Sequence, residues 1–191
     1  ADSSPVTEAD EKAEAIILAG LTDFAPDIPA IGEEAYSAGV RPDISGGLFW
    51  LVDALDGTKE FVNKRDEFTV NIALIENGLP VFGIVHAPAI SRTFWGGGFG
   101  AFCKDGENEE HSIEARIPAD DGLVVVASRS HRDGEEEFLK DYVVKNVVNS
   151  GSSLKICLIA SGEADLYPRL GPTSEWDIAA GHAVLAAAGG S

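Results

Sequence analysis

The strongest constraint on the fold is a pair of β-type segments, residues 68–75 and 79–86, on either side of the dipeptide Asn77-Gly78. Asn-Gly between two alternating apolar runs is a strong hairpin signal, because both residues tolerate the positive φ angles that a two-residue turn requires. The apolar run over residues 48–52 indicates a further, buried strand. The first half of the chain therefore predicts an α+β unit built on an antiparallel sheet.

The segments that follow alternate between helical and strand patterns. The pattern from Thr7 to Asp10 is typical of a helix start and predicts a helix over residues 8–21. A polar, acidic stretch, residues 104–121, separates two halves, and we predict subdomains over residues 1–118 and 119–191. The other expected elements are a loop over 37–47, strands over 93–103, 123–127, 143–149 and 164–167, and helices over 134–141, 153–161 and 175–188. This order predicts an α/β second half.

Composition excludes several classes of protein. The 191 residues are 45% hydrophobic and 24% charged, which is typical of a globular chain. Fourteen Lys and Arg residues against 32 Asp and Glu residues give a formal net charge of −18, which repels phosphate backbones. We therefore expect no nucleic acid polymer as partner. An anionic substrate requires that cations or a local basic cluster reverse the sign of the charge within its site.

The sequence predicts a soluble, cytoplasmic protein without integral membrane association. No stretch approaches the roughly 20 apolar residues of a membrane span, and residues 1–5 lack signal-peptide character. The two cysteines, Cys103 and Cys157, have no metal or redox spacing. We interpret them as reduced thiols without chemistry of their own.

A candidate ligand site follows the apolar run that ends at Val52. Asp53 and Asp56 supply two carboxylates and Leu55 a backbone carbonyl, which are oxygen ligands of the kind that Mg²⁺ prefers. Gly57 and Thr58 could present backbone N–H groups to a phosphate at a helix start. A polar strand-to-helix turn with Asp as a cap explains the same residues, and both interpretations stay open.

Three further acids could contribute to such a site. Glu33 follows Gly32, Asp177 opens an Ala-rich segment, and Asp10 lies in the first predicted helix. Each has an ordinary explanation, since Ser174 to Asp177 also fits a capping box and acids are common on the surface of so acidic a chain. These residues alone would not indicate an enzyme.

Two segments resemble the signatures of the inositol monophosphatase superfamily, a group of Mg²⁺-dependent and often lithium-sensitive phosphatases. They are W-L-V-D-A-L-D-G-T-K-E-F at 50–61 and E-W-D-I-A-A-G at 175–181, and residues 4–10 and 32–34 fall in family order and spacing. Ala54 stands where the family has Pro. Family members normally begin with a helix before Asp2 and continue past Ser191. Residues 59–61, 127–131, 151–155 and 166–169 are similar to the 3′(2′),5′-bisphosphate nucleotidase branch.

The resemblance implies a layered α/β/α/β/α sandwich that binds two or three Mg²⁺ ions around a phosphomonoester. The implied metal ligands are Glu33, Asp53, the Leu55 carbonyl, Asp56 and Asp177. Thr58, hydrogen-bonded to Asp10 and close to Glu33, would activate the attacking water. The implied substrate-binding residues are Gly57, Thr58, Arg129, His131, Ser152, Lys155 and Arg169.

The function implied by this branch is hydrolysis of 3′-phosphoadenosine 5′-phosphate to AMP and phosphate, a clearing step in sulfate assimilation. One alternative is inositol monophosphate hydrolysis at the same metal site, which should not depend on Lys155 or Arg169. Another is a non-catalytic metal- or nucleotide-binding relative. The expected partner is a small phosphorylated nucleotide, and the chain is expected to be a monomer or a homodimer.

Overall fold

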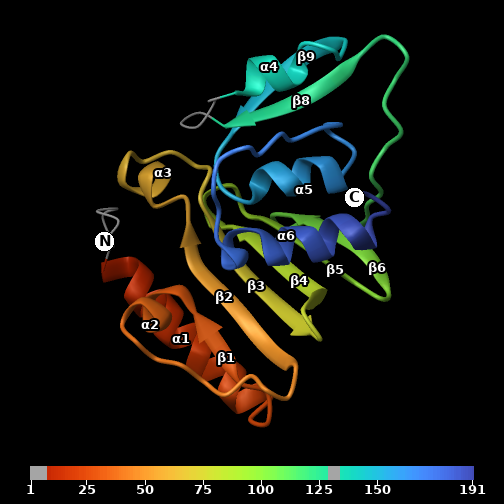
Figure 1. Ribbon diagram of the computed structural model, residues 1–191. Helices are drawn as coiled ribbons and strands as arrows, with labels where there is room; N and C mark the ends of the chain where they lie inside the picture. Colours follow the sequence, from red (N-terminus) through yellow and green to blue (C-terminus); the bar gives the residue numbers. More distant parts are fainter. Residues whose placement is uncertain (1–7, 129–133) are drawn as a thin grey trace.

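The computed structural model describes residues 8–128 and 134–191, which form a seven-stranded sheet, a two-stranded sheet and flanking helices (Figure 1). The strands of the large sheet lie side by side in chain order, and β1 and β2 are parallel while the other neighbours are antiparallel. They are β1 (Ala30–Gly32), β2 (Leu48–Asp56), β3 (Thr69–Glu76), β4 (Leu79–Ala87), β5 (Arg92–Gly97), β6 (Gly100–Asp105) and β7 (His111–Ser112). The predicted mixed α/β class is confirmed.

The hairpin that the Asn-Gly signal predicts is present between β3 and β4. Asn77 and Gly78 have φ angles of 51° and 81°, the left-handed values that a two-residue hairpin turn needs. The single strand predicted over residues 93–103 is wrong, because the chain reverses after Gly97 and pairs it with Gly100. That segment forms the β5–β6 hairpin instead.

Four helices begin within one residue of their predicted starts at residues 8, 134, 153 and 175, whereas the helix over Glu33–Ser37 was not predicted. The helices are α1 (Glu8–Phe24), α2 (Glu33–Ser37), α3 (Thr58–Val62), α4 (Glu135–Leu139), α5 (Leu154–Ala160) and α6 (Glu175–Ala187), with a 3₁₀ turn, η1 (Pro88–Ile90). Helix α1 continues past its predicted end at Leu21 to Phe24 and ends before Pro26, whose ring disfavours helical backbone at the preceding residue. Within the described ranges, no helix is both long and apolar enough to cross a membrane.

Helices α5 and α6 lie between the two sheets, whereas α1 and α2 lie beside β1 and β2 (Figure 1). Helix α6 packs so closely on the large sheet that a Cβ atom at Gly83 would lie 2.2 Å from the carbonyl oxygen of Ala180. The core between them includes Val85, Phe94 and Val184, all fully buried. Burial of apolar groups of this size stabilises the fold by about 1.5–3 kcal/mol per side chain.

The second sheet consists of β8 (Leu123–Ser128) and β9 (Val144–Ser150), which are parallel. The strand predicted over residues 164–167 is wrong, because only Leu166 forms a bridge, with Val125, and Pro168 then lacks the N–H group that a ladder needs. The predicted subdomain boundary at residue 118 falls between the two sheets along the chain. It stays a prediction, since α5 and α6 belong to the second half but join the core of the first.

Candidate active site

The candidate site is centred on an irregular stretch of β2. We predicted that the strand ends at Val52, but it continues to Asp56 with a register shift between Asp53 and Asp56. The Oδ1 atom of Asp53 accepts a hydrogen bond from the N–H group of Leu55 at 2.9 Å, which stabilises the local turn. Such bulges redirect side chains at the ends of sheets. Both carboxylates therefore belong to an irregular strand rather than to the turn that follows it.

Parallel pairing of β1 and β2 brings a second carboxylate to Asp53. Gly32 is the register partner of Val52, so Glu33 and Asp53 follow neighbouring positions on adjacent strands. Asp177, in the first turn of α6, completes a group in which one carboxylate oxygen of each residue lies within 4.8 Å of the others. Three of the predicted metal ligands are therefore brought together from segments that are far apart in the sequence.

The electrostatics of this group indicate an excess of negative charge. Burial, followed by repulsion from Asp177, raises the pKa of Glu33 to about 7. Burial and the neighbouring Asp56 raise the pKa of Asp53 well above its ordinary value. Burial raises the pKa of Asp56 to about 6, against the opposing effect of Lys155. A divalent cation would relieve this repulsion, and an all-oxygen donor set fits Mg²⁺.

Asp177 also caps helix α6, as the alternative interpretation of this residue predicted. Its Oδ2 atom accepts hydrogen bonds from the hydroxyl of Thr173 at 2.7 Å and from the N–H group of Ser174 at 3.0 Å, within a complete capping box. Both bonds use the same oxygen. The cap thereby fixes the orientation of a carboxylate that also belongs to the acidic group.

Asp56 connects the acidic group to helix α5. Its Oδ2 atom accepts a hydrogen bond from the N–H group of Ser153 at 2.5 Å. The Ser153 hydroxyl in turn donates to Oδ1 of Asn71 at 2.6 Å and lies 2.8 Å from the hydroxyl oxygen of Thr69. This buried polar network fixes the Asp56 side chain, although Asp56 is not in the 4.8 Å group.

A pocket of about 220 Å³ adjoins the acidic group. Asp56 and Asp177 line one part of it, and the buried Lys155 and the side chain of Arg169 line another. The Lys155 ammonium donates to the carbonyl oxygen of Ser152 at 2.5 Å and lies 5.2 Å from the ring centroid of Tyr167. The pocket therefore combines carboxylates with two cations, the local basic cluster that an anionic substrate requires.

Most of the predicted substrate-binding residues share this pocket. They are Gly57, Thr58, Ser152, Lys155 and Arg169, whereas Arg129 and His131 lie outside the described residues. Helix α3 begins at Thr58, after a left-handed Gly57, as the sequence suggests. The Thr58 hydroxyl donates to the Leu55 carbonyl oxygen at 3.3 Å, and a Thr58–Asp10 hydrogen bond stays a prediction.

Asp10 belongs to the same acidic neighbourhood. Burial, followed by repulsion from Glu34 and Glu14, raises its pKa to about 7. Its negative charge is also one cause of the raised pKa of Glu33. Asp10 therefore lies close enough to Glu33 to influence its charge.

Glu14, a buried residue one helical turn after Asp10 on α1, was not among the predicted site residues. Its carboxylate accepts hydrogen bonds from the N–H groups of Glu34 and Ala35, each at 2.8 Å, at the start of α2. These bonds position the helix that begins at Glu33. The spacing of Asp10 and Glu14 by four residues was the available signal, since it puts both acids on one helix face.

Comparison with known proteins identifies the family and several similar proteins. Residues 1–191 match the model described as the inositol monophosphatase family. The chain is 48% identical over 192 residues to the Salmonella typhimurium protein named 3′(2′),5′-bisphosphate nucleotidase CysQ, covering 98% of this chain and 75% of that protein. The corresponding Escherichia coli K12 protein is 46% identical, with 99% and 76% covered.

Solved structures of inositol monophosphatase family proteins have a similar fold. The crystal structure of CysQ from Bacteroides thetaiotaomicron, titled a bacterial member of the inositol monophosphatase family, superposes with a TM-score of 0.81 at 38% identity, covering 99% of this chain and 76% of that one. The inositol monophosphatase from Anabaena gives a TM-score of 0.80 at 26% identity, with 96% and 73% covered.

Proposed function

Because this chain belongs to the inositol monophosphatase family, a family of phosphatases, we propose that it is a Mg²⁺-dependent 3′(2′),5′-bisphosphate nucleotidase. Its substrate would be 3′-phosphoadenosine 5′-phosphate, which water cleaves to AMP and inorganic phosphate. The observation that carries this proposal is one pocket lined by Asp56 and Asp177 together with Lys155 and Arg169. The names of the CysQ relatives support the same substrate class.

The acidic group would hold the metal. Glu33, Asp53, Asp56, Asp177 and the Leu55 carbonyl offer oxygen donors of the kind that Mg²⁺ requires, for two or three ions. When bound, Mg²⁺ lowers the pKa of a coordinated water and neutralises charge on the transferring phosphoryl group. The raised pKa values of these carboxyl groups without metal support this assignment, since they report charge that a cation would balance.

The remaining steps belong to side chains of this chain. Thr58, Asp10 and Glu33 would orient the attacking water and accept its proton. The N–H groups of Gly57 and Thr58 at the start of α3 would bind oxygens of the phosphoryl group that is cleaved. No covalent intermediate with the protein is needed, because water attacks the phosphorus directly.

The second phosphate and the nucleoside would occupy the part of the pocket lined by Ser152, Lys155 and Arg169. Lys155 is only 5% exposed, so its charge acts in a poorly hydrated environment where it is strong. The side chain of Arg169 also lines the pocket, and its Nη2 atom donates to the carbonyl oxygen of Pro172 at 2.8 Å, which fixes the guanidinium there. Arg129 and His131 would assist. Lithium sensitivity, a cytoplasmic location and a role in sulfate assimilation belong to the same proposal.

Substitution of Asp56 by Asn tests the proposal. Asp56→Asn removes a carboxylate charge from the metal site but retains an oxygen that can accept the hydrogen bond from Ser153. We expect Mg²⁺-dependent phosphate release from 3′-phosphoadenosine 5′-phosphate to be lost, with an unchanged circular dichroism spectrum. Near-wild-type turnover by the folded variant would contradict the proposed metal site.

A further inference from the structure

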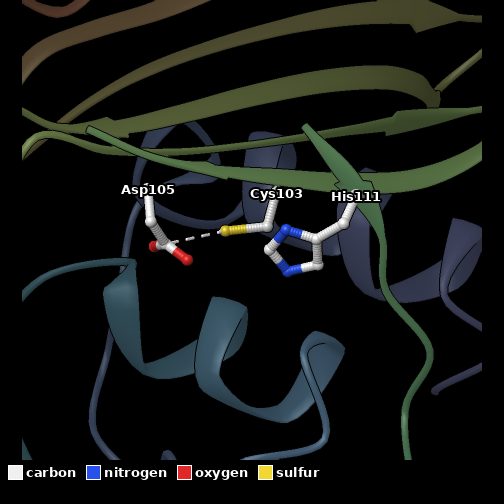
Figure 2. A group of neighbouring side chains, drawn as sticks. All are labelled: Cys103, Asp105 and His111. Atoms are coloured by element: carbon white, nitrogen blue, oxygen red, sulfur yellow. Dashed lines mark hydrogen bonds between the residues drawn. The ribbon is translucent and has the colours of Figure 1, made fainter. Parts of the chain in front are cut away.

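A second group of metal-binding side chains lies at the edge of the large sheet, away from the pocket. Cys103 and Asp105 are two residues apart on β6, and His111 on β7 is the register partner of Cys103. Residues at i and i+2 of a strand share a face, and directly paired residues on neighbouring strands do the same. The backbone therefore projects these three side chains from one face of the sheet, as Figure 2 shows.

The donor atoms of the three side chains lie close together. One donor atom from each residue lies within 4.8 Å of the other two. The Cys103 sulfur and Oδ1 of Asp105 are 3.8 Å apart, and Figure 2 shows the thiol between the carboxylate and the imidazole. Zn²⁺ binds thiolate at about 2.3 Å and nitrogen or oxygen at about 2.0–2.2 Å, so small side-chain movements would bring all three within range.

We propose that Cys103, Asp105 and His111 form a binding site for a thiophilic divalent cation of the Zn²⁺ type, with water as the fourth ligand. Sulfur and imidazole nitrogen select such ions over Mg²⁺, which prefers oxygen ligands only. The site is thus chemically distinct from the carboxylate group around Asp53. The proposal differs from our interpretation of Cys103 as a thiol without chemistry, which considered cysteine spacing alone.

The charged groups around the site are one guanidinium, which also lies beside the Cys103 thiol, and two carboxylates. The guanidinium of Arg92 contacts Oδ1 of Asp105 at 2.7 Å through Nε and Oε1 of Glu163 at 2.6 Å through Nη2. With a neutral thiol, this group of one cation and two carboxylates carries a charge of −1. Binding of a divalent cation with loss of the thiol proton brings the sum to zero, since three positive charges then face three negative ones.

Arg92 also has a positioning role in this site. Its contact with Asp105 fixes the carboxylate at the edge of β6, and its guanidinium carbon lies 4.7 Å from the ring centroid of Phe94, which is fully buried. A charged neighbour that holds a carboxylate in place reduces the movement needed before it can bind an ion. A bound ion would also join the two-residue strand β7 to β6, to which the pairs Phe102–Ser112 and Cys103–His111 connect it.

Cobalt absorption spectroscopy tests the site directly, because a thiolate bound to Co²⁺ gives a charge-transfer band that carboxylate ligands do not. The full chain, reduced and with excess Mg²⁺ to occupy the carboxylate group, is titrated with Co²⁺. We expect a saturable thiolate band that Zn²⁺ abolishes by competition. Absence of the band in the folded protein would overturn the proposal.

Two variants assign the band to this site. His111→Ala removes an exposed ligand, so the fold should be retained, and we expect the Co²⁺ affinity to fall by about tenfold or more. His182→Ala, which removes an exposed histidine on α6, is the matched control and should leave the affinity unchanged. Cys103→Ser should abolish the band. A band that persists in Cys103→Ser, or an affinity unaffected by His111→Ala, would assign the signal elsewhere and refute the site.

Discussion

Gly32 at the end of β1 leaves room for the carboxyl group of Glu14, since a Cβ atom at Gly32 would lie 2.3 Å from the Cδ atom of Glu14. This close approach lets Glu14 reach the first N–H groups of α2. A helix without such a partner would leave those donors unsatisfied. Helix α1 therefore determines where α2, and with it Glu33, is placed beside Asp53.

Glu14→Gln should weaken metal binding although Glu14 is not one of the proposed ligands. In Gln an NH₂ donor replaces one of the two carboxylate oxygens and faces one of the N–H groups, so the start of α2 would shift and displace Glu33. We expect the Kd for Mg²⁺, measured by calorimetry, to rise by about tenfold, the usual size of effects on groups that support a ligand.

The control for Glu14 is Asp23→Asn, which removes one negative charge from an exposed position near the other end of α1. It should leave the Kd for Mg²⁺ within about twofold of the wild-type value, because its charge is screened by solvent. Equal weakening by the two variants would mean that charge alone matters and that Glu14 does not position Glu33.

Substrate preference should depend on Lys155. Lys155→Met keeps the volume of this buried side chain but removes its charge, which would neutralise the second phosphate of the nucleotide. We expect KM for 3′-phosphoadenosine 5′-phosphate to rise by about tenfold or more, while KM for inositol 1-phosphate changes little, because that substrate has no second phosphate.

Lys145→Met provides the comparison for Lys155, since Lys145 lies on the surface and pairs with Asp121 at 2.5 Å. Both KM values should then match those of the wild type. If Lys155→Met raised the two KM values equally, Lys155 would have a general role in the pocket and the nucleotide preference would have another origin.

The stability of the metal-free protein should fall as pH rises through the acidic range. The pKa of Glu33 is raised to about 7 and that of Asp56 to about 6, so the native state binds more protons than the unfolded chain between about pH 4 and about pH 7. More bound protons in the native state mean that stability decreases with rising pH. Mg²⁺ should reverse the loss, because it replaces those protons.

Thermal unfolding in chelator and in Mg²⁺, at both ends of this pH window, measures the effect. The increase in Tm caused by Mg²⁺ should be larger at the upper end, and Glu33→Gln should reduce the difference between the two ends. Carboxyl groups with lowered pKa values, such as Asp165 beside Arg116, stabilise the fold throughout this window. Their contribution to the free energy of unfolding is lost only as the pH falls below it. A Mg²⁺ effect that does not vary with pH would contradict the assignment of these carboxyl groups to the metal site.

The sequence predicted the parts of the fold that depend on residues close together in the chain. The turn at Asn77 and Gly78 and the capping box of α6 depend on residues that are neighbours in the chain. The length of β2 did not follow from sequence, because its extension to Asp56 requires pairing with Thr69. The short contact at Leu166 likewise depends on tertiary placement beside Val125.

The residues of the two candidate metal sites also differ in whether the sequence could predict them. The family resemblance led to Glu33, Asp53 and Asp177, and the structure brings them within reach of one ion. Glu14 was missed because its hydrogen-bond partners are 20 and 21 residues away. The group around Cys103 was missed because it requires the register of β7, a strand of two residues that periodicity cannot detect.

Phosphate release tests whether this protein is a Mg²⁺-dependent bisphosphate nucleotidase. The substrates are 3′-phosphoadenosine 5′-phosphate and inositol 1-phosphate, each with Mg²⁺, with chelator and with added Li⁺. We expect rapid release from the nucleotide in Mg²⁺, none in chelator, inhibition by Li⁺, and much slower release from inositol 1-phosphate. Release from inositol 1-phosphate at an equal or higher rate, or nucleotide hydrolysis that persists in chelator, would contradict the proposed function.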